Sequence, residues 1–112
     1  MIRDAEEFIR LRTSANPADY LRAASEDAPL EVWHEVIRCH PRMRSWVALS
    51  KAVPIEILTI LAGDPDPDIR CCVAMKNKLP KELMRKLAED EDESVRERIA
   101  YNKNGPARLA DD

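Results

Sequence analysis

Prolines at a nearly constant spacing are the feature that most constrains the fold of this chain. Pro54, Pro80 and Pro106 follow one another at intervals of 26 residues, and Pro29 precedes Pro54 by 25. Equivalent positions between these prolines carry similar residues, in the pairs Ile57/Leu83, Leu61/Leu87, Ala62/Ala88, Asp64/Asp90, Asp66/Asp92, Ile69/Val95, Arg70/Arg96, Val73/Ile99 and Ala74/Ala100. Self-similarity at such a period indicates a repeat protein, in which each unit buries its apolar face against a neighbour.

Each repeat is expected to contain two short helices. Proline suits the first position of the first helix, because its missing N–H would have had no partner there. Asp66 followed by Pro67 predicts the start of a second helix, since aspartate caps helix N-termini, and Asp92 occupies the same place one repeat later. Ile69 and Val73 lie four residues apart, which places them on one apolar helix face. No segment shows the alternation of a strand.

The expected fold class is therefore all-α, a short right-handed α-solenoid of about three two-helix repeats within one domain of 112 residues. The repeats are predicted at 29–53, 54–79 and 80–105, and the segment 106–112 is predicted to be a C-terminal cap. Residues 1–28 are predicted to form an atypical helical N-terminal cap, with a packing face made by Ile2, Phe8, Ile9 and Leu11. Within this cap, residues 17–27 weakly resemble the first helix of a repeat.

The stretch VAMKNKLPKELMRKLAEDEDESVRERIAYNKNGP resembles the leucine-rich repeat variant, a bacterial HEAT-like helical repeat, over roughly residues 43–110. The resemblance rests on the pairs Val73-Ala74 and Ile99-Ala100, each ending shortly before a proline, and on the aspartates ahead of an IR or VR pair. The family's usual asparagine-proline is replaced here, by Ser50-Lys51, Lys76-Asn77 and Asn102-Lys103. One member of the family carries an iron–sulfur cluster on a cysteine-rich extension. That extension has no counterpart here, so no cofactor is expected.

Composition restricts the location and the function classes. Charged residues make up 35% of the chain and the net charge is −3, so nothing in the overall charge favours nucleic acid or an anionic membrane. The apolar stretch around Ile57–Leu61 is far too short to span a bilayer, and residues 1–7 lack the apolar core of a signal peptide. The three cysteines, two of them adjacent, suit reduced thiols better than a disulfide framework. A cytoplasmic protein is expected.

Motifs that carry chemistry are missing from the sequence. Two glycines cannot form a glycine-rich phosphate loop, and no GxSxG, HExxH or CxxC motif occurs, so the chain is expected not to be an enzyme. His34, Cys39 and His40 have the chemistry of zinc ligands, but a fourth ligand at suitable spacing is missing. No metal is therefore expected. The alternative is that Cys39 packs and both histidines lie near the turn before Pro41.

Arginine recurs at one repeat position, as Arg44, Arg70 and Arg96, and this column has two interpretations. They could form a ladder that binds anions. The favoured interpretation is structural, because each arginine follows an acidic turn closely enough to bond to Asp64, Asp66, Asp90 or Asp92.

The face of the second helices opposite the core is predicted to line the concave side of the solenoid and to bind a partner. The residues chosen there are Trp46, Leu49, Cys72, Met75, Arg98 and Tyr101. Aromatic and methionine side chains are enriched at interface cores, which favours a binding stripe. The alternative left open is that the N-terminal cap covers part of Trp46.

Charge is divided between the two kinds of turn. The turns within repeats are acidic, and their carboxylates are also predicted to bind the partner: Asp64, Asp66, Asp68, Glu89, Asp90, Glu91, Asp92 and Glu93. The turns between repeats are basic, with Lys51, Lys76, Lys78, Lys81 and Lys103. Such a layout could steer a basic partner, although runs of charge commonly serve only to solvate loops and cap helices.

The function expected from the sequence is that of a non-enzymatic protein–protein interaction module. Its sharper form is a bacterial immunity or inhibitor protein that neutralises a basic toxin or nuclease, by analogy with other small acidic proteins. One alternative is a HEAT-like nucleic-acid-binding protein of the DNA-repair type, using the lysine edge with Trp46. Another is a repeat domain of a larger scaffold.

Overall fold

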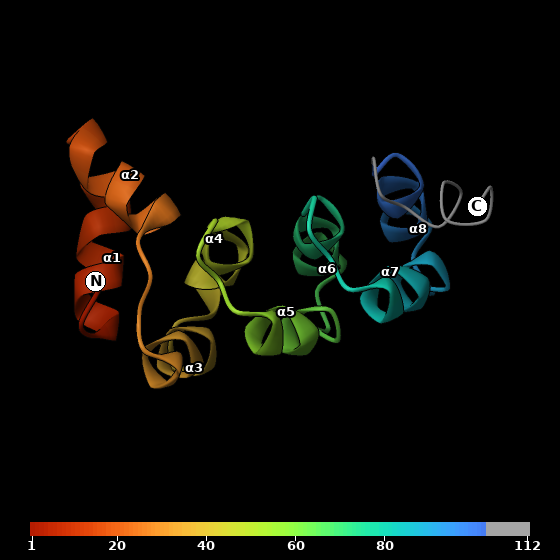
Figure 1. The fold of residues 1–112 in the computed structure, drawn as a ribbon, viewed down its shortest axis with the longest axis horizontal. Coiled ribbons are helices and arrows are strands. Elements are labelled where there is room, and N and C mark those ends of the chain that lie inside the picture. The colour runs from red at the N-terminus through yellow and green to blue at the C-terminus, as the bar shows by residue number, and fades with distance from the viewer. Residues whose placement is uncertain (103–112) are drawn as a thin grey trace. The chain divides into compact units, whose positions relative to one another are not determined.

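All regular structure in residues 1–102, the part described by this computed structural model, is helical (Figure 1), which confirms the all-α class. The elements in chain order are α1 (Ala5–Thr13), α2 (Pro17–Ser25), α3 (Leu30–Cys39), the short 3-10 helix η1 (Pro41–Met43), α4 (Arg44–Leu49), α5 (Ile55–Leu61), α6 (Pro67–Ala74), α7 (Lys81–Ala88) and α8 (Glu93–Ala100). None of these helices is long and apolar enough to cross a membrane. The C-terminal cap predicted at 106–112 and the end of the 80–105 repeat lie outside the described residues.

The chain divides into two compact units, residues 1–57 and residues 58–112, and the border falls within α5. The first unit contains α1 to α4. The second contains α6 to α8 and is described as far as Asn102.

The second helices of the repeats begin with the predicted caps, whereas the first helices begin one residue later than predicted. A carboxylate oxygen of Asp66 accepts the backbone N–H of Asp68 at 2.9 Å, and Asp92 accepts that of Ser94 at 2.8 Å, which confirms both caps. Pro67 occupies the first turn of α6 as expected. Pro29 and Pro80 instead precede the first helical residue, because their ψ angles of 147° and 146° are extended. The prediction of proline at the first helical position was therefore wrong by one residue for α3 and α7, and α5 likewise begins one residue after Pro54.

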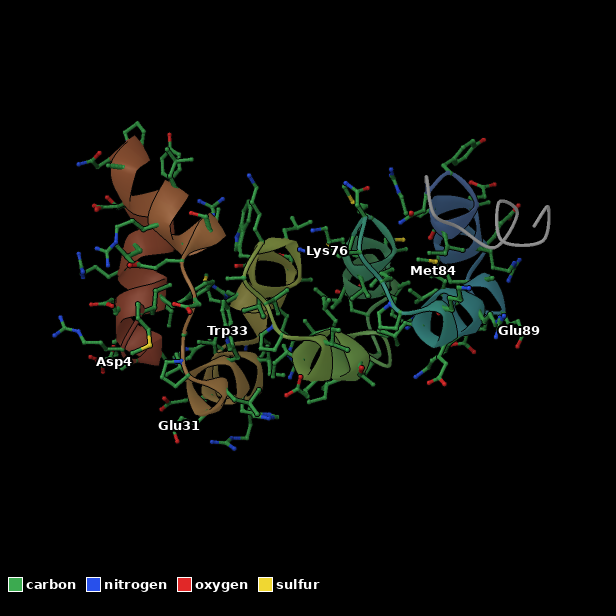
Figure 2. All side chains as sticks on the ribbon, in the orientation of Figure 1. Asp4, Glu31, Trp33, Lys76, Met84 and Glu89 are labelled. Carbon is green, nitrogen blue, oxygen red and sulfur yellow. The ribbon has the colours of Figure 1, made fainter. Side chains whose placement is uncertain are left out.

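The N-terminal segment of the first unit is a pair of helices. Helix α1 packs on α2 and α3, and α2 packs on α4. Phe8 of α1 meets Trp33 of α3 (labelled in Figure 2) edge to face, with ring centroids 5.8 Å apart and an angle of 67° between the planes. Ile2, Phe8 and Leu11 are buried as expected, whereas Ile9 is only half-buried.

Helix α2 corrects the expected register of the N-terminal cap. Residues 17–27 were predicted to resemble a first helix, yet α2 packs beside α4, the second helix of the following pair. Its start is also that of a second helix, because Asn16 caps it and Pro17 occupies its first turn, as Asp66 and Pro67 do in α6. The pair α1–α2 therefore follows the order of a repeat, with α1 in the place of a first helix.

In the second unit, α6 packs against α7 and α8, and α7 against α8. The core is apolar and is drawn from all three helices: Ile69, Val73, Ala74, Leu83, Met84, Leu87, Val95 and Ile99. Met84 lies between α7 and α8 in Figure 2. Met84, Leu58 and Trp33 occupy equivalent repeat positions, and all three are buried, as their alignment predicts.

Arg70 is a charged residue buried beside this core. Its Nε and Nη2 donate to the two carboxylate oxygens of Asp90 at 2.9 and 3.1 Å, and Nη1 donates to the backbone carbonyl of Asp64 at 2.6 Å. At the equivalent positions, Arg96 donates to the carbonyl of Asp90 at 2.7 Å, and Arg44 donates to that of Ile37 at 2.6 Å. The structural interpretation of the arginine column is confirmed for Arg70 and Arg96, which both bond to Asp90.

Replacing Arg70 tests how strongly this bond holds the second unit. Arg70→Ala should lower the free energy of unfolding by about 3 kcal/mol, because Asp90 then keeps a poorly solvated charge without its partner. Arg96 holds the same repeat position but is exposed, so Arg96→Ala should cost less than about 1 kcal/mol. Urea denaturation followed by far-UV circular dichroism measures both, and equal losses would contradict this account of Arg70.

Candidate partner-binding surface

Exposed apolar side chains of the first unit gather where α2 packs beside α4. On α4, Trp46 and Leu49 keep 40% and 37% of their surface exposed, although they are among the largest side chains of this unit. Together with residues from α1 and α2 they line a pocket of about 170 Å³, which we call the α2–α4 pocket. Its lining residues are Arg12, Tyr20, Leu21, Ala23, Ala24, Trp46 and Leu49.

Arg12, from the last turn of α1, lies on the aromatic side of this pocket. Its guanidinium carbon is 3.3 Å from the centroid of the Trp46 ring and 5.8 Å from that of Tyr20. At this distance the cation is attracted by the ring face. The N-terminal segment therefore does cover part of Trp46, as one interpretation of the sequence held, while the remaining 40% stays open.

Sequence reasoning selected Trp46 and Leu49 but missed Arg12, Tyr20 and Leu21. The sequence did contain a signal for Leu21. Aligning Asn16-Pro17 with Asp66-Pro67 places Leu21 at the position of Cys71, next to Cys72 on the face of the second helices opposite the core. The stacking of Arg12 on Trp46 has no periodic signal, since it depends on how α1 packs.

Most of the stripe residues predicted in the second unit line a hollow within that unit. Met75, Arg98 and Tyr101 line a hollow of about 270 Å³ with Ala74, Asn77 and Asn102, and Met75 and Tyr101 are 49% and 85% exposed. Cys72 is half-buried and does not line this hollow. The predicted stripe therefore consists of two parts, with Trp46 and Leu49 in the first unit and Met75, Arg98 and Tyr101 in the second.

The acidic turns of the second unit are largely occupied with building the fold. Asp64 is buried and accepts the backbone N–H of Asp66, and Asp90 likewise accepts that of Asp92 in addition to binding Arg70. Hydrogen bonds from the side chain and backbone of Ser94 lower the pKa of Asp92. Asp66 is exposed although it caps α6, and the other exposed acidic side chains of these turns are Asp68, Glu89, Glu91 and Glu93. Figure 2 shows Glu89 at the outer end of α7.

The lysines of the turns between repeats also differ in their exposure. Lys51, Lys78 and Lys81 are exposed, whereas Lys76 is half-buried and its burial lowers its pKa. Lys103 lies outside the described residues.

Within residues 1–102, no group of three or more histidine, cysteine, aspartate or glutamate side chains is arranged to hold a metal ion. Cys39 is exposed, so the expectation that it packs was wrong. It is the last residue of α3, where the helix ends. It lines a shallow hollow with Ile9, His40, Pro41, Arg42 and Met43.

Comparison of the chain with protein-family models, with curated proteins and with solved structures finds no match in any of the three. The resemblance to the leucine-rich repeat variant accordingly stays a prediction. The functional argument rests on the geometry of the described residues.

The three thiols should differ in reactivity with a soluble disulfide reagent. Cys39 is exposed, whereas burial, the neighbouring Cys71 and the acidic side chains of α6 raise the pKa of Cys72. Since the thiolate is the reactive form, Cys39 should react first, and Cys39→Ser should remove the fast phase. The rate at Cys72 should still increase above pH 9, the ordinary cysteine value. A fast phase that survives Cys39→Ser would contradict this order.

Proposed function

We propose that this protein is a non-enzymatic module that binds another protein. The observation that carries the proposal is the set of partly exposed apolar side chains around the α2–α4 pocket, namely Tyr20, Leu21, Trp46 and Leu49. Tryptophan, tyrosine and arginine dominate the energetics of protein interfaces, and a continuous apolar group of this kind is typical of a docking surface. Arg12 adds the third of these residue types to the same place.

The proposed architecture is a short α-solenoid of repeats like those of the leucine-rich repeat variant. Three recurrences within the units support it. Helices α2, η1 and α6 each begin with a proline, the arginine column bonds to a carbonyl before each second helix, and the carboxylates of Asp64 and Asp90 close equivalent turns.

A basic partner is the sharper form of the proposal, and an inhibitor of a basic toxin or nuclease would be one such case. Its support is the exposed group Glu89, Glu91 and Glu93, together with a net charge of −3. Carboxylates of this kind accelerate association with a cation more than they add affinity.

A pull-down from a lysate of the source organism tests the two surfaces separately. Trp46→Ala with Leu49→Ala should lose the partner retained by the wild type, because the anchor side chains are removed. Met75→Ala with Tyr101→Ala tests the hollow of the second unit. The matched control is Leu30→Ala, whose side chain on α3 is 41% exposed and lies outside the α2–α4 pocket. Capture unchanged in both double variants, or capture of nucleic acid alone, would refute the proposal.

Charge reversal tests the basic partner once it is identified. Glu89, Glu91 and Glu93 should be changed to lysine together while Asp90 and Asp92 are kept, because these two aspartates hold the fold. The association rate should fall about tenfold or more at low salt and lose most of its dependence on ionic strength. Stopped-flow kinetics measures this, and an unchanged rate would argue against steering by these side chains.

A further inference from the structure

Arg12 gives the α2–α4 pocket its chemical character. It is the one charged side chain among the seven residues that line this pocket, and the other six contribute mainly apolar or aromatic surface. The pocket therefore combines an apolar wall with a single positive charge at its side. An occupant that fits it needs both an apolar group and a negative charge.

The guanidinium of Arg12 is held in place but has no acceptor among residues 1–102. Its described interactions are the two ring contacts, with Trp46 and Tyr20. Arginine carries five N–H donors, and stacking on a ring face leaves the donors at the edge of the guanidinium able to bind an acceptor. Because the group is already ordered against Trp46, a carboxylate that binds it loses less conformational freedom than one that binds a mobile arginine.

On the α4 side of the pocket the chain carries no negative charge, while on the α2 side Asp19 accepts a hydrogen bond from the hydroxyl of Ser14 at 2.7 Å. Residues 40–53 contain Arg42, Arg44 and Lys51 and no acidic residue. The backbone N–H of Lys51 donates to the carbonyl of Ala24 at 2.8 Å, and Ala24 lines the pocket. The segment that carries the exposed Lys51 is therefore bonded directly to the pocket wall. Charge complementarity favours an acidic occupant.

The size of the pocket restricts the occupant further. A volume of about 170 Å³ is below the roughly 300 to 1,000 Å³ of sites for drug-sized molecules. It fits one apolar side chain whose backbone continues outside.

We propose that the α2–α4 pocket binds a peptide segment of the protein partner in which an apolar side chain stands next to an acidic one. The apolar side chain contacts Leu21, Trp46 and Leu49, and the carboxylate accepts hydrogen bonds from the guanidinium of Arg12. This inference rests on the proposed function, since it names what the partner presents to one of the two surfaces.

Short peptides titrated into the full chain test the proposal. The probes are acetylated, amidated peptides of the sequence Ser-Gly-Leu-Glu-Gly-Ser, with otherwise identical peptides that carry Gln or Lys in place of Glu. The indole resonance of Trp46 in a 1H–15N spectrum reports on the pocket, and that of Trp33, which is 1% exposed, serves as an internal reference. The Glu peptide should bind in the millimolar range or tighter and about three- to tenfold more tightly than the Gln peptide.

Variants of the pocket assign the preference to Arg12. Arg12→Gln should abolish the preference for Glu over Gln while leaving weak binding of the leucine, and Arg12→Lys should retain part of it. Arg10→Gln is the matched control, because Arg10 is exposed on the same helix and does not line the pocket. Circular dichroism establishes that each variant is folded before it is compared.

Three results would overturn the inference. They are equal affinity for the Glu and Gln peptides, tighter binding of the Lys peptide, and no shift of the Trp46 resonance with any peptide at millimolar concentration. None of these results refutes protein binding as such. If the pull-down still loses its partner with Trp46→Ala and Leu49→Ala, the proposed function stands and only the chemistry of the occupant is wrong.

Discussion

The hydrogen-bonded pairing of Arg70 with Asp90 is the interaction on which the second unit depends. One guanidinium joins the turn before α6, through the carbonyls of Asp64 and Pro65, to the turn before α8, through both carboxylate oxygens of Asp90. Asp90 in turn accepts the backbone N–H of Asp92, whose carboxylate caps α8. The turns before two helices are therefore joined by one network, and its central pair of Arg70 and Asp90 has little access to water, where such bonds are strongest.

Several of the acidic residues predicted to bind a partner have a structural role in this network. A count of charges along the chain suggests one continuous negative edge, but Asp64, Asp66, Asp90 and Asp92 accept hydrogen bonds that hold turns and helix ends. The carboxylates with the strongest claim to a role in binding are those left to solvent. The capping aspartates keep their charge and still add to the field that attracts a partner, but fewer of their oxygens are left to contact it directly.

The features that could be predicted from the sequence are those that depend on contacts within a repeat. The caps at Asp66 and Asp92 and the buried face of Ile69 and Val73 follow from spacing alone, and the structure confirms them. The features that could not be predicted depend on packing between elements distant in sequence. Arg12 has no periodic counterpart, and its place on Trp46 arises from the contacts of α1 with α2 and of α2 with α4. The sequence therefore predicted only the α4 residues of the pocket, Trp46 and Leu49.

The hydrogen bonds of Arg44, Arg70 and Arg96 determine which duplications of the sequence keep every arginine paired. The bond from Arg96 to the carbonyl of Asp90 spans six residues, and that from Arg44 to Ile37 spans seven, so each is completed inside a single period. The bond from Arg70 to Asp90 spans twenty residues and joins one period to the next. A tandem duplication of one whole period would copy a donor and an acceptor together and leave no buried charge without a partner. An insertion of another length between Arg70 and Asp90 would instead change the spacing that brings this guanidinium to its carboxylate.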